Sequence, residues 1–305
     1  MDISLEYLQK AIRKSYPEII IESCSQYSDA YVNEVYKIET NKGNYVLKKY
    51  DDRSSWKARK EALVYELIQA KTSVPVPEIH IPDTRKTILP FAYLLMSEIS
   101  GKTLKEYYKE SQNEYEKIGE KVGKCLAELH SITFNHFGFI DDRGILPEEN
   151  WQNYFIDNLF QYSWWEAFSK TNIPEEILYN AASYIKKRQD LLKNINQPTF
   201  VHADFTQNNI KFEDEEISGI IDVEWAFSGD PIYDFTKIEL FMPNDIKKPI
   251  IKGYQSKRDL NSDFNELSTI YLIEKALRLY YFNSKRKDEK EKARILNIIK
   301  KHLNL

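Results

Sequence analysis

Residues 200–210 read FVHADFTQNNI, and residues 219–222 read GIID. Asp204 follows a short predicted strand, and Asn209 lies five positions later, where the chain turns back into the next strand. We expect this tight loop to hold Asp204 and Asn209 on one side of a cleft, with Asp222 emerging beside them at the end of the following strand. Mg²⁺ is commonly held by one or two protein oxygen ligands and by substrate phosphates. Asn209 and Asp222 are therefore predicted to hold magnesium, which leaves Asp204 to face an incoming hydroxyl group.

The order of these three residues is typical of kinase-type phosphoryl transfer. In that chemistry a catalytic-loop Asp orients or deprotonates the nucleophile, and an Asn and a later Asp hold the metal ions. Taken singly, each residue also has an ordinary structural explanation. An Asp at the end of a strand usually forms a turn, and a single His such as His202 usually belongs to a core. The combination of residue types and spacings is what favours phosphoryl transfer.

A nucleotide kinase also needs a cation for the phosphates and a carboxylate on the neighbouring helix to position that cation. Lys48 stands at the end of the predicted strand at residues 44–48, and Glu61 lies early on the next predicted helix. Lys49 should point to the opposite face, because strand side chains alternate. An exposed lysine and a surface carboxylate would be the alternative explanation, but the downstream motif favours the Lys48–Glu61 pair.

A longer set of motifs carries a resemblance to a known family. In chain order, the matching stretches are Val74–Pro77, the hinge strand Leu94–Glu98, Gly101, Leu126–His130, His202-x-Asp204-x-x-x-x-Asn209, Ile220–Asp222 and Gly229–Pro231. Over residues 19–240 the chain resembles the aminoglycoside phosphotransferase and choline kinase-like family, which is similar to protein kinases in fold. The resemblance implies a two-lobed kinase-like fold, ATP or GTP, Mg²⁺, and transfer of the γ-phosphoryl group to the hydroxyl of a small molecule.

The resemblance also implies a role for each matching residue. By this resemblance Asp204 would be the catalytic base, and Asn209 and Asp222 would be the metal ligands. Lys48 would anchor the nucleotide phosphates, and Glu61 would be the partner of Lys48. Residues from Ser97 to Ile99 would offer backbone contacts to the purine. His202, Asp230 and Asp234 would brace the catalytic loop.

The rest of the sequence predicts an α+β fold in two lobes. Residues 1–98 would form a nucleotide-binding lobe, a small antiparallel sheet with one helix against it, and residues 99–305 a larger, mainly helical catalytic and acceptor lobe. The expected strands of the first lobe are 19–21, 34–38, 44–48, 78–81 and 88–96. Leu63, Leu67 and Ala70 form the apolar stripe predicted for its helix.

Helices are further expected at residues 4–16, around 118–129 and 177–192, and over 266–282 and 294–303. Short strands at 200–201, 210–212 and 217–221 interrupt the helical lobe.

Glycine is scarce, with only nine in the chain. Protein kinases cover the nucleotide phosphates with a glycine-rich loop between their first two strands. The corresponding residues 24–30 read CSQYSDA and contain no glycine. Backbone amides or the hydroxyls of Ser25 and Ser28 could replace that contact. The departure weakens a protein-kinase interpretation more than an antibiotic-kinase one.

Composition excludes several other classes. The chain has 305 residues, a formal charge of −4 and two cysteines. Mild acidity argues against nucleic-acid binding, and neither an apolar membrane span nor a signal peptide is visible. Two distant cysteines predict free thiols rather than a disulfide or a zinc site. We expect a cytoplasmic monomer with a small-molecule hydroxyl acceptor.

Within the family, the catalytic stretch and the residues from Phe137 to Trp151 are similar to hygromycin phosphotransferases. This similarity favours an aminoglycoside-type antibiotic as acceptor. A polycationic acceptor would need an acidic pocket. The carboxylates proposed for it include Glu224, Asp157 and Glu266, although each could equally be an ordinary surface residue.

Two alternatives stay open at this point. The first keeps the chemistry and changes the acceptor to a metabolite such as choline, homoserine, methylthioribose or a fructosamine. The second is a non-catalytic nucleotide-binding protein on the same fold.

Overall fold

The computed structural model of the chain describes residues 5–27, 34–161 and 164–305, which group into two compact units. The first unit comprises residues 1–114, 140–144 and 207–226, and the second comprises residues 115–139, 145–206 and 227–305. The division of functions at residue 98 stays a prediction. Among the described residues, no helix combines the length and the apolar character needed to cross a membrane.

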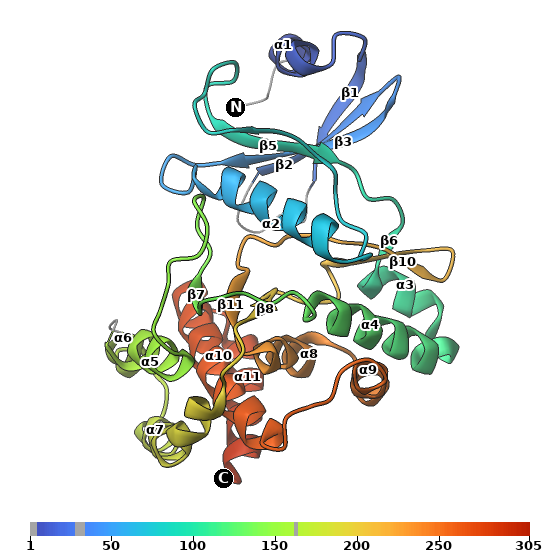
Figure 1. The fold of residues 1–305 in the computed structure, drawn as a ribbon. Coiled ribbons are helices and arrows are strands. Elements are labelled where there is room, and N and C mark those ends of the chain that lie inside the picture. The colour runs from blue at the N-terminus through green and yellow to red at the C-terminus, as the bar shows by residue number, and fades with distance from the viewer. Residues whose placement is uncertain (1–4, 28–33, 162–163) are drawn as a thin grey trace. The chain divides into compact units, whose positions relative to one another are not determined.

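The first unit is built on an antiparallel sheet with the strand order β1-β2-β3-β5-β4 (Figure 1). Its strands are β1 (Ile21–Gln26), β2 (Glu34–Thr40), β3 (Gly43–Tyr50), β4 (Ile79–Asp83) and β5 (Ala92–Ser97). Strands β2 and β3 form the predicted hairpin, closed by the pair Thr40 and Gly43. Helix α1 (Leu5–Ser15) contributes Leu8 and Ile12 to the apolar cluster on one face of this sheet. The predicted small antiparallel sheet is confirmed.

Helix α2 (Lys57–Lys71) contacts β3, β4 and β5, as predicted, but the predicted apolar stripe is wrong. Leu63 is 37% exposed and Ala70 is also exposed. The buried residues are Ala58, Lys60, Glu61, Ala62, Val64, Tyr65 and Ile68. The face that carries charged and hydroxyl groups is turned inward, because those groups have partners inside the first unit.

The predicted strand at residues 19–21 is also displaced. Ile19 is buried ahead of the sheet, Ile20 is 53% exposed, and the strand itself runs from Ile21 to Gln26. This strand has a polar sequence because it is an edge strand with one pairing neighbour, so half of it faces solvent. Cys24, Ser25 and Gln26 of the predicted phosphate loop therefore belong to β1, and Ser28 lies outside the described residues.

A second, smaller sheet in the first unit has the order β10-β9-β6. Its strands are β6 (Lys102–Thr103), β9 (Ile210–Glu213) and β10 (Glu216–Ile220), accompanied by α3 (Leu104–Glu110) and η1 (Gln112–Glu114). Gly101 has φ +89°, and a Cβ there would lie 2.3 Å from the backbone oxygen of Phe212, so only glycine fits. Strand β9 begins just after Asn209 and β10 ends two residues before Asp222, which brings both predicted metal ligands to one end of a hairpin.

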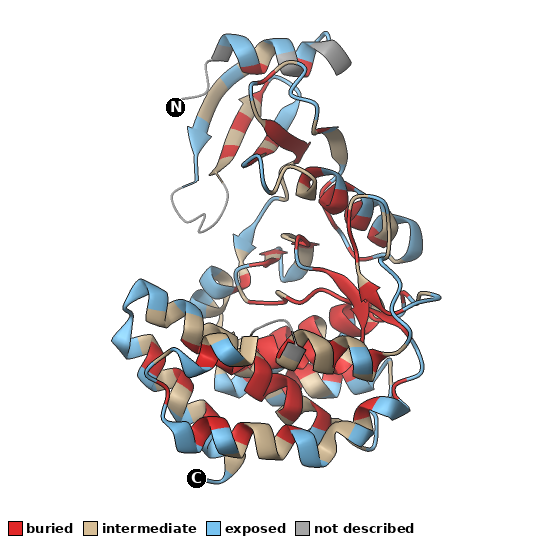
Figure 2. Cartoon of the chain, turned by 90° about the vertical axis from the view of Figure 1, so that its left-hand side faces the viewer, coloured by how far each residue is buried: buried red, intermediate tan, exposed pale blue. Residues whose placement is uncertain are grey.

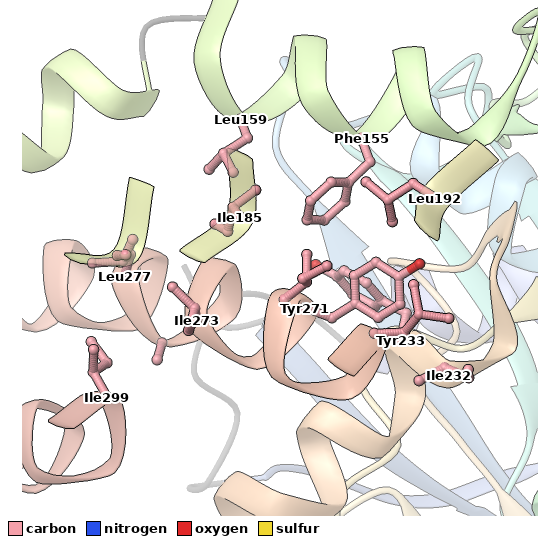
Figure 3. Packing of buried hydrophobic residues seen from close by; sticks show 14 of the residues in the cluster. Phe155, Leu159, Ile185, Leu192, Ile232, Tyr233, Tyr271, Ile273, Leu277 and Ile299 are labelled. Carbon is pink, nitrogen blue, oxygen red and sulfur yellow. The ribbon is translucent and has the colours of Figure 1, made fainter. Parts of the chain in front are cut away.

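The second unit is mainly helical, as predicted. Its helices are α4 (Tyr115–Leu129), α5 (Trp151–Ile156), η2 (Asp157–Gln161), α6 (Trp164–Ser169), α7 (Glu175–Arg188), η3 (Gln189–Asn194), η4 (Pro231–Asp234), α8 (Phe235–Phe241), α9 (Asn244–Gln255), α10 (Phe264–Arg286) and α11 (Glu289–Leu303). Figure 3 shows Phe155, Ile185, Leu277 and Ile299, from four of these helices, in one apolar cluster. Buried residues follow the inner helix faces (Figure 2).

A short sheet in this unit has the order β7-β11-β8. Its strands are β7 (Gly138–Phe139), β8 (Thr199–Val201) and β11 (Phe227–Gly229). All three residues of β8 and all three residues of β11 are buried, which anchors the start of the catalytic stretch immediately before His202.

Candidate active site

The first unit contains a buried lysine with three carboxylate partners. Lys48 Nζ lies 2.9 Å from Glu61 Oε1, 2.8 Å from Asp222 Oδ1 and 3.4 Å from Glu224 Oε2. Burial works to lower the pKa of Lys48, yet Asp222 and Glu61 raise it well above its usual value. The lysine is therefore a permanent cation held at a fixed place, as the anchor of a nucleotide phosphate must be.

Glu61 is fully buried on α2. Its Oε1 accepts a second hydrogen bond, from the Tyr50 hydroxyl at 2.7 Å, whereas its Oε2 has no hydrogen-bonding partner within the described chain. Burial raises the pKa of this carboxyl, and the charge of Lys48 opposes the rise. Lys48 and Glu61, paired in the sequence analysis, are thus in contact, and their roles toward a nucleotide stay predictions.

Asp222 has a strained backbone, with φ +62°, a region that non-glycine residues seldom occupy. Its N–H donates to the Tyr65 hydroxyl at 2.8 Å, and the preceding N–H, of Ile221, donates to the Asn209 backbone oxygen at 2.9 Å. These bonds place Asn209 next to the Asp222 loop, so the two predicted ligands come together.

The donor set at this point fits a magnesium ion. Asn209 offers an amide oxygen and Asp222 a carboxylate, which are the hard oxygen ligands that Mg²⁺ prefers. Lys48 holds Asp222 Oδ1, and Oδ2 carries no hydrogen bond from the residues that the structure describes. One carboxylate oxygen is thus left for a cation or for water.

Glu224 was predicted to bind the acceptor, and it lies instead within the Lys48 cluster. It is 2% exposed, and its Oε1 is 3.7 Å from Lys57 Nζ. One oxygen of each of Glu61, Asp222 and Glu224 lies within 4.8 Å of the others. Two lysines therefore offset three neighbouring carboxylates, and an acceptor role for Glu224 stays a prediction.

Asp204 belongs to the second unit. Its N–H donates to His202 Nδ1 at 3.2 Å, and its Oδ1 accepts from Lys237 Nζ at 2.6 Å. The side chain of Asp204 is 25% exposed and that of Lys237 is 11% exposed. The carboxylate is thus fixed by an ion pair while it keeps access to solvent.

The backbone around Asp204 is braced by a buried carboxylate. Asp234 accepts the N–H of His202 at 2.8 Å and that of Ala203 at 2.7 Å, and it lies 3.1 Å from His130 Nε2. Burial lowers the pKa of His130, so its ring is neutral and donates Nε2–H to Asp234. Ala203 has φ +63°, and these bonds offset the cost of that conformation. The predicted bracing role of His202 and Asp234 agrees with this geometry.

The residues predicted to contact the purine or the acceptor lie on other elements than Lys48, Asp222 and Asp204. Ser97 ends β5, where its N–H donates to Glu78 O at 2.9 Å and its Oγ accepts from Glu78 N, so its amide is engaged in the sheet. Ile99 packs against Gly219. Asp157 begins η2 and Glu266 is exposed in the first turn of α10. Purine and acceptor roles for these residues stay predictions.

Two groups of this site were missed by sequence reasoning. Tyr65 follows Glu61 by four residues and Lys237 follows Asp234 by three, spacings that put each pair on one face of a helix. Helical spacing from a motif residue could have identified both.

Known proteins resemble this chain in sequence and in fold. The model of the phosphotransferase enzyme family matches residues 23–255. A homoserine kinase of Agrobacterium fabrum is 28% identical over an alignment of 180 residues, and the match covers 53% of this chain and 49% of that kinase. The chain thus matches about half the length of that curated relative.

Solved structures resemble the chain over nearly its whole length. A ternary complex of the aminoglycoside phosphotransferase APH(4)-Ia with ADP and hygromycin B has a TM-score of 0.76 at 15% identity, covering 97% of this chain and 98% of that one. The GDP and kanamycin complex of APH(2")-IIIa has a TM-score of 0.71 at 14% identity, covering 98% of each chain. At these identities the likeness establishes the kinase-like fold, and the predicted fold class is confirmed.

Proposed function

The chain belongs to the phosphotransferase enzyme family, and from this membership we propose that it is a small-molecule kinase that transfers the γ-phosphoryl group of ATP or GTP to a hydroxyl group. The observation that carries the proposal is the buried Lys48, bonded at once to Glu61 and Asp222. A lysine held between a helix carboxylate and a predicted metal ligand is the arrangement that phosphoryl transfer requires.

Lys48 would contact the nucleotide phosphates, and Asn209 and Asp222 would hold magnesium. When bound, magnesium would neutralise charge on the transferred phosphoryl group. The solved relatives that bind ADP and GDP support a nucleotide as the phosphoryl donor. The N–H groups of Ser97 and Glu98 are both engaged, with Glu78 O and Asn44 O, so an N–H contact to either purine from this stretch would come from Ile99.

Asp204 would receive the proton of the attacking hydroxyl. Lys237 holds one of its oxygens, which fixes the position of the carboxylate. A carboxylate fixed in this way orients the hydroxyl for in-line attack, and orientation is the main contribution a protein makes to this chemistry.

Two acceptor classes follow from the relatives. The aminoglycoside class, predicted from the sequence, is supported by fold neighbours that bind hygromycin B or kanamycin. The metabolite class is supported by the homoserine kinase similarity. We favour a metabolite, because Lys237 neutralises Asp204 and so removes the attraction that this carboxylate would exert on a polycation.

The test is release of ADP from Mg-ATP, or of GDP from Mg-GTP, measured over a panel of aminoglycosides and hydroxy metabolites. Asp204→Asn should lower kcat by about a thousandfold, because a general base contributes roughly 10²–10⁴ to the rate. Asp214→Asn, at an exposed turn of the first unit, is the matched control and should leave kcat unchanged.

Equal rates for wild type and Asp204→Asn would refute the assigned base. Binding of Mg-ATP without turnover of any acceptor would instead support a non-catalytic nucleotide-binding protein.

A further inference from the structure

A second lysine of the second unit lies on α10, a helix that contacts α8, which carries Lys237. Lys275 is on α10, and its Nζ lies 5.0 Å from the centroid of the Tyr233 ring. The charges of Lys237 and Asp204 both act on it. Its side chain is partly buried, and it makes no hydrogen bond or ion pair with residues of the described chain.

The carboxylates around this lysine are already engaged. Glu274 accepts the Tyr233 hydroxyl at 3.0 Å through one oxygen and pairs with Arg278 through the other. Asp204 pairs with Lys237. Three of the groups described here are cations: Lys237, Lys275 and Arg278. Two are carboxylates, Asp204 and Glu274, and both carboxylates have partners other than Lys275.

The second lysine also stays charged at neutral pH. Burial and then the charge of Lys237 lower the pKa of Lys275 to about 8, so most of its side chains carry a proton at pH 7. An ammonium group that is partly removed from water and lacks a counter-ion is costly. An anionic ligand would relieve that cost, whereas an ammonium-bearing ligand would increase it.

We propose that Lys275 and Lys237 bind an anionic group of the acceptor, so that the substrate is an alcohol bearing a carboxylate or a phosphate. Because Lys237 also holds Asp204, the anionic group lies only a few bonds from the reacting hydroxyl. This inference rests on the proposed kinase function and narrows its acceptor. The protein then selects against polycationic antibiotics by charge.

The test compares matched pairs of acceptors in the ADP-release assay. The pairs are 4-hydroxybutyrate with 1,4-butanediol, D-glycerate with glycerol, and glycerol 3-phosphate with glycerol, alongside the zwitterion L-homoserine, kanamycin and hygromycin B. We expect kcat/KM for the anionic member of at least one pair to exceed that of its neutral partner by about tenfold or more. The first two pairs report a carboxylate and the third a phosphate.

Variants then connect the preference to the lysine. Lys275→Met should raise KM for the anionic acceptor about tenfold while kcat and the nucleotide KM change less than about threefold, since a binding contact is lost. Lys275→Arg should retain most of the preference. Lys285→Met, an exposed lysine on the same helix, is the control, and thermal unfolding of each variant checks its folding.

The outcomes separate the two proposals. Turnover of kanamycin or hygromycin B in preference to every anionic alcohol would overturn this inference and leave the kinase function intact. An anionic preference that survives Lys275→Met in a folded protein would overturn the residue assignment. Absence of turnover with all acceptors, despite Mg-nucleotide binding, would overturn the kinase function itself.

Discussion

Asp230 illustrates how single buried residues support the catalytic stretch. It is 2% exposed, its Oδ1 accepts the N–H of Ile232 at 3.0 Å, and its Oδ2 accepts the Tyr271 hydroxyl at 2.6 Å. Tyr271 in turn accepts from Trp151 Nε1 at 2.7 Å. Burial raises the pKa of Asp230 from 3.8 to about 6, although both hydrogen bonds oppose the rise. The residue therefore braces the turn at some electrostatic cost.

That cost predicts a pH dependence of stability. Between pH 4 and pH 6 the folded state binds more protons at Asp230 than the unfolded state, so the free energy of unfolding falls as the pH rises. A shift of about two pKa units corresponds to about 3 kcal/mol. In urea titrations from pH 3.5 to 7, wild type should lose about this much relative to Asp230→Asn. Parallel curves for the two proteins would contradict the prediction, and Asp214→Asn should parallel wild type.

Lys48 compensates three carboxylates at once. Lys48→Met would leave Glu61 buried beside Asp222 without its cation, and removing one partner of a buried pair costs about 3–5 kcal/mol. We expect lower stability in urea titration and a kcat/KM for Mg-nucleotide reduced at least a hundredfold, or roughly 3 kcal/mol of transition-state stabilisation. Lys49→Met is the control, because Lys49 points to the other face and pairs with Glu34, so its activity should stay near wild type. Equal loss in both variants would show that the effect is not specific to the cluster.

Helices α4 and α9 pack closely against each other at positions that are occupied by glycine. A Cβ on Gly123 would lie 2.0 Å from the backbone oxygen of Ile250, and one on Gly253 would lie 2.2 Å from that of Glu120. A third contact, between Gly119 and Pro249, is similarly close. The obstructing atoms are mostly backbone, which cannot move aside as a side chain can. These glycines, rather than a phosphate loop, account for part of the chain's small glycine content.

The crossing predicts a large effect of one methyl group. Gly123→Ala should lower the free energy of unfolding by about 2–3 kcal/mol, because overpacking outweighs the gain in helix propensity. Lys124→Ala, the exposed neighbour on α4, should change it by less than about 0.5 kcal/mol. Denaturant midpoints of the two variants measure the difference. A stabilised Gly123→Ala protein would mean that the helices can separate without cost.

Elements with local signals were predictable from the sequence, and those that depend on distant partners were not. The β2–β3 hairpin was predictable from its β-branched and aromatic residues and from the turn sequence that ends at Gly43. Strand β9 was predictable from its short apolar stretch between polar turns. The inward face of α2 was mispredicted because Glu61 and Tyr65 are buried by bonds to Lys48 and Asp222, and apolar periodicity contains no information about such bonds. The site motif was predictable because its spacing is local, but the Lys237–Asp204 pair joins residues 33 positions apart.

At the scale of the whole chain, the groups proposed to bind the nucleotide and magnesium and the residue proposed to act on the acceptor fall in different units. Lys48, Glu61, Asn209 and Asp222 belong to the first unit, and Asp204 to the second. The segment at residues 207–226 joins the first unit although it is far from the N-terminus in sequence. A bound nucleotide should therefore contact both the N-terminal part of the first unit, which carries Lys48, and the segment at residues 207–226.

Hydrogen exchange of the full chain tests this arrangement. A bound, magnesium-loaded ATP analogue should slow amide exchange in β3, α2 and residues 207–226 and leave exchange in α11 unchanged. Only the first three segments contain the groups proposed to bind phosphate and metal. At a ligand concentration a hundred times Kd, binding should also stabilise the protein by about 2.7 kcal/mol. Lys48→Met should remove both effects at the same concentration. Protection of α11 without protection of residues 207–226 would place the nucleotide elsewhere and refute the proposed site.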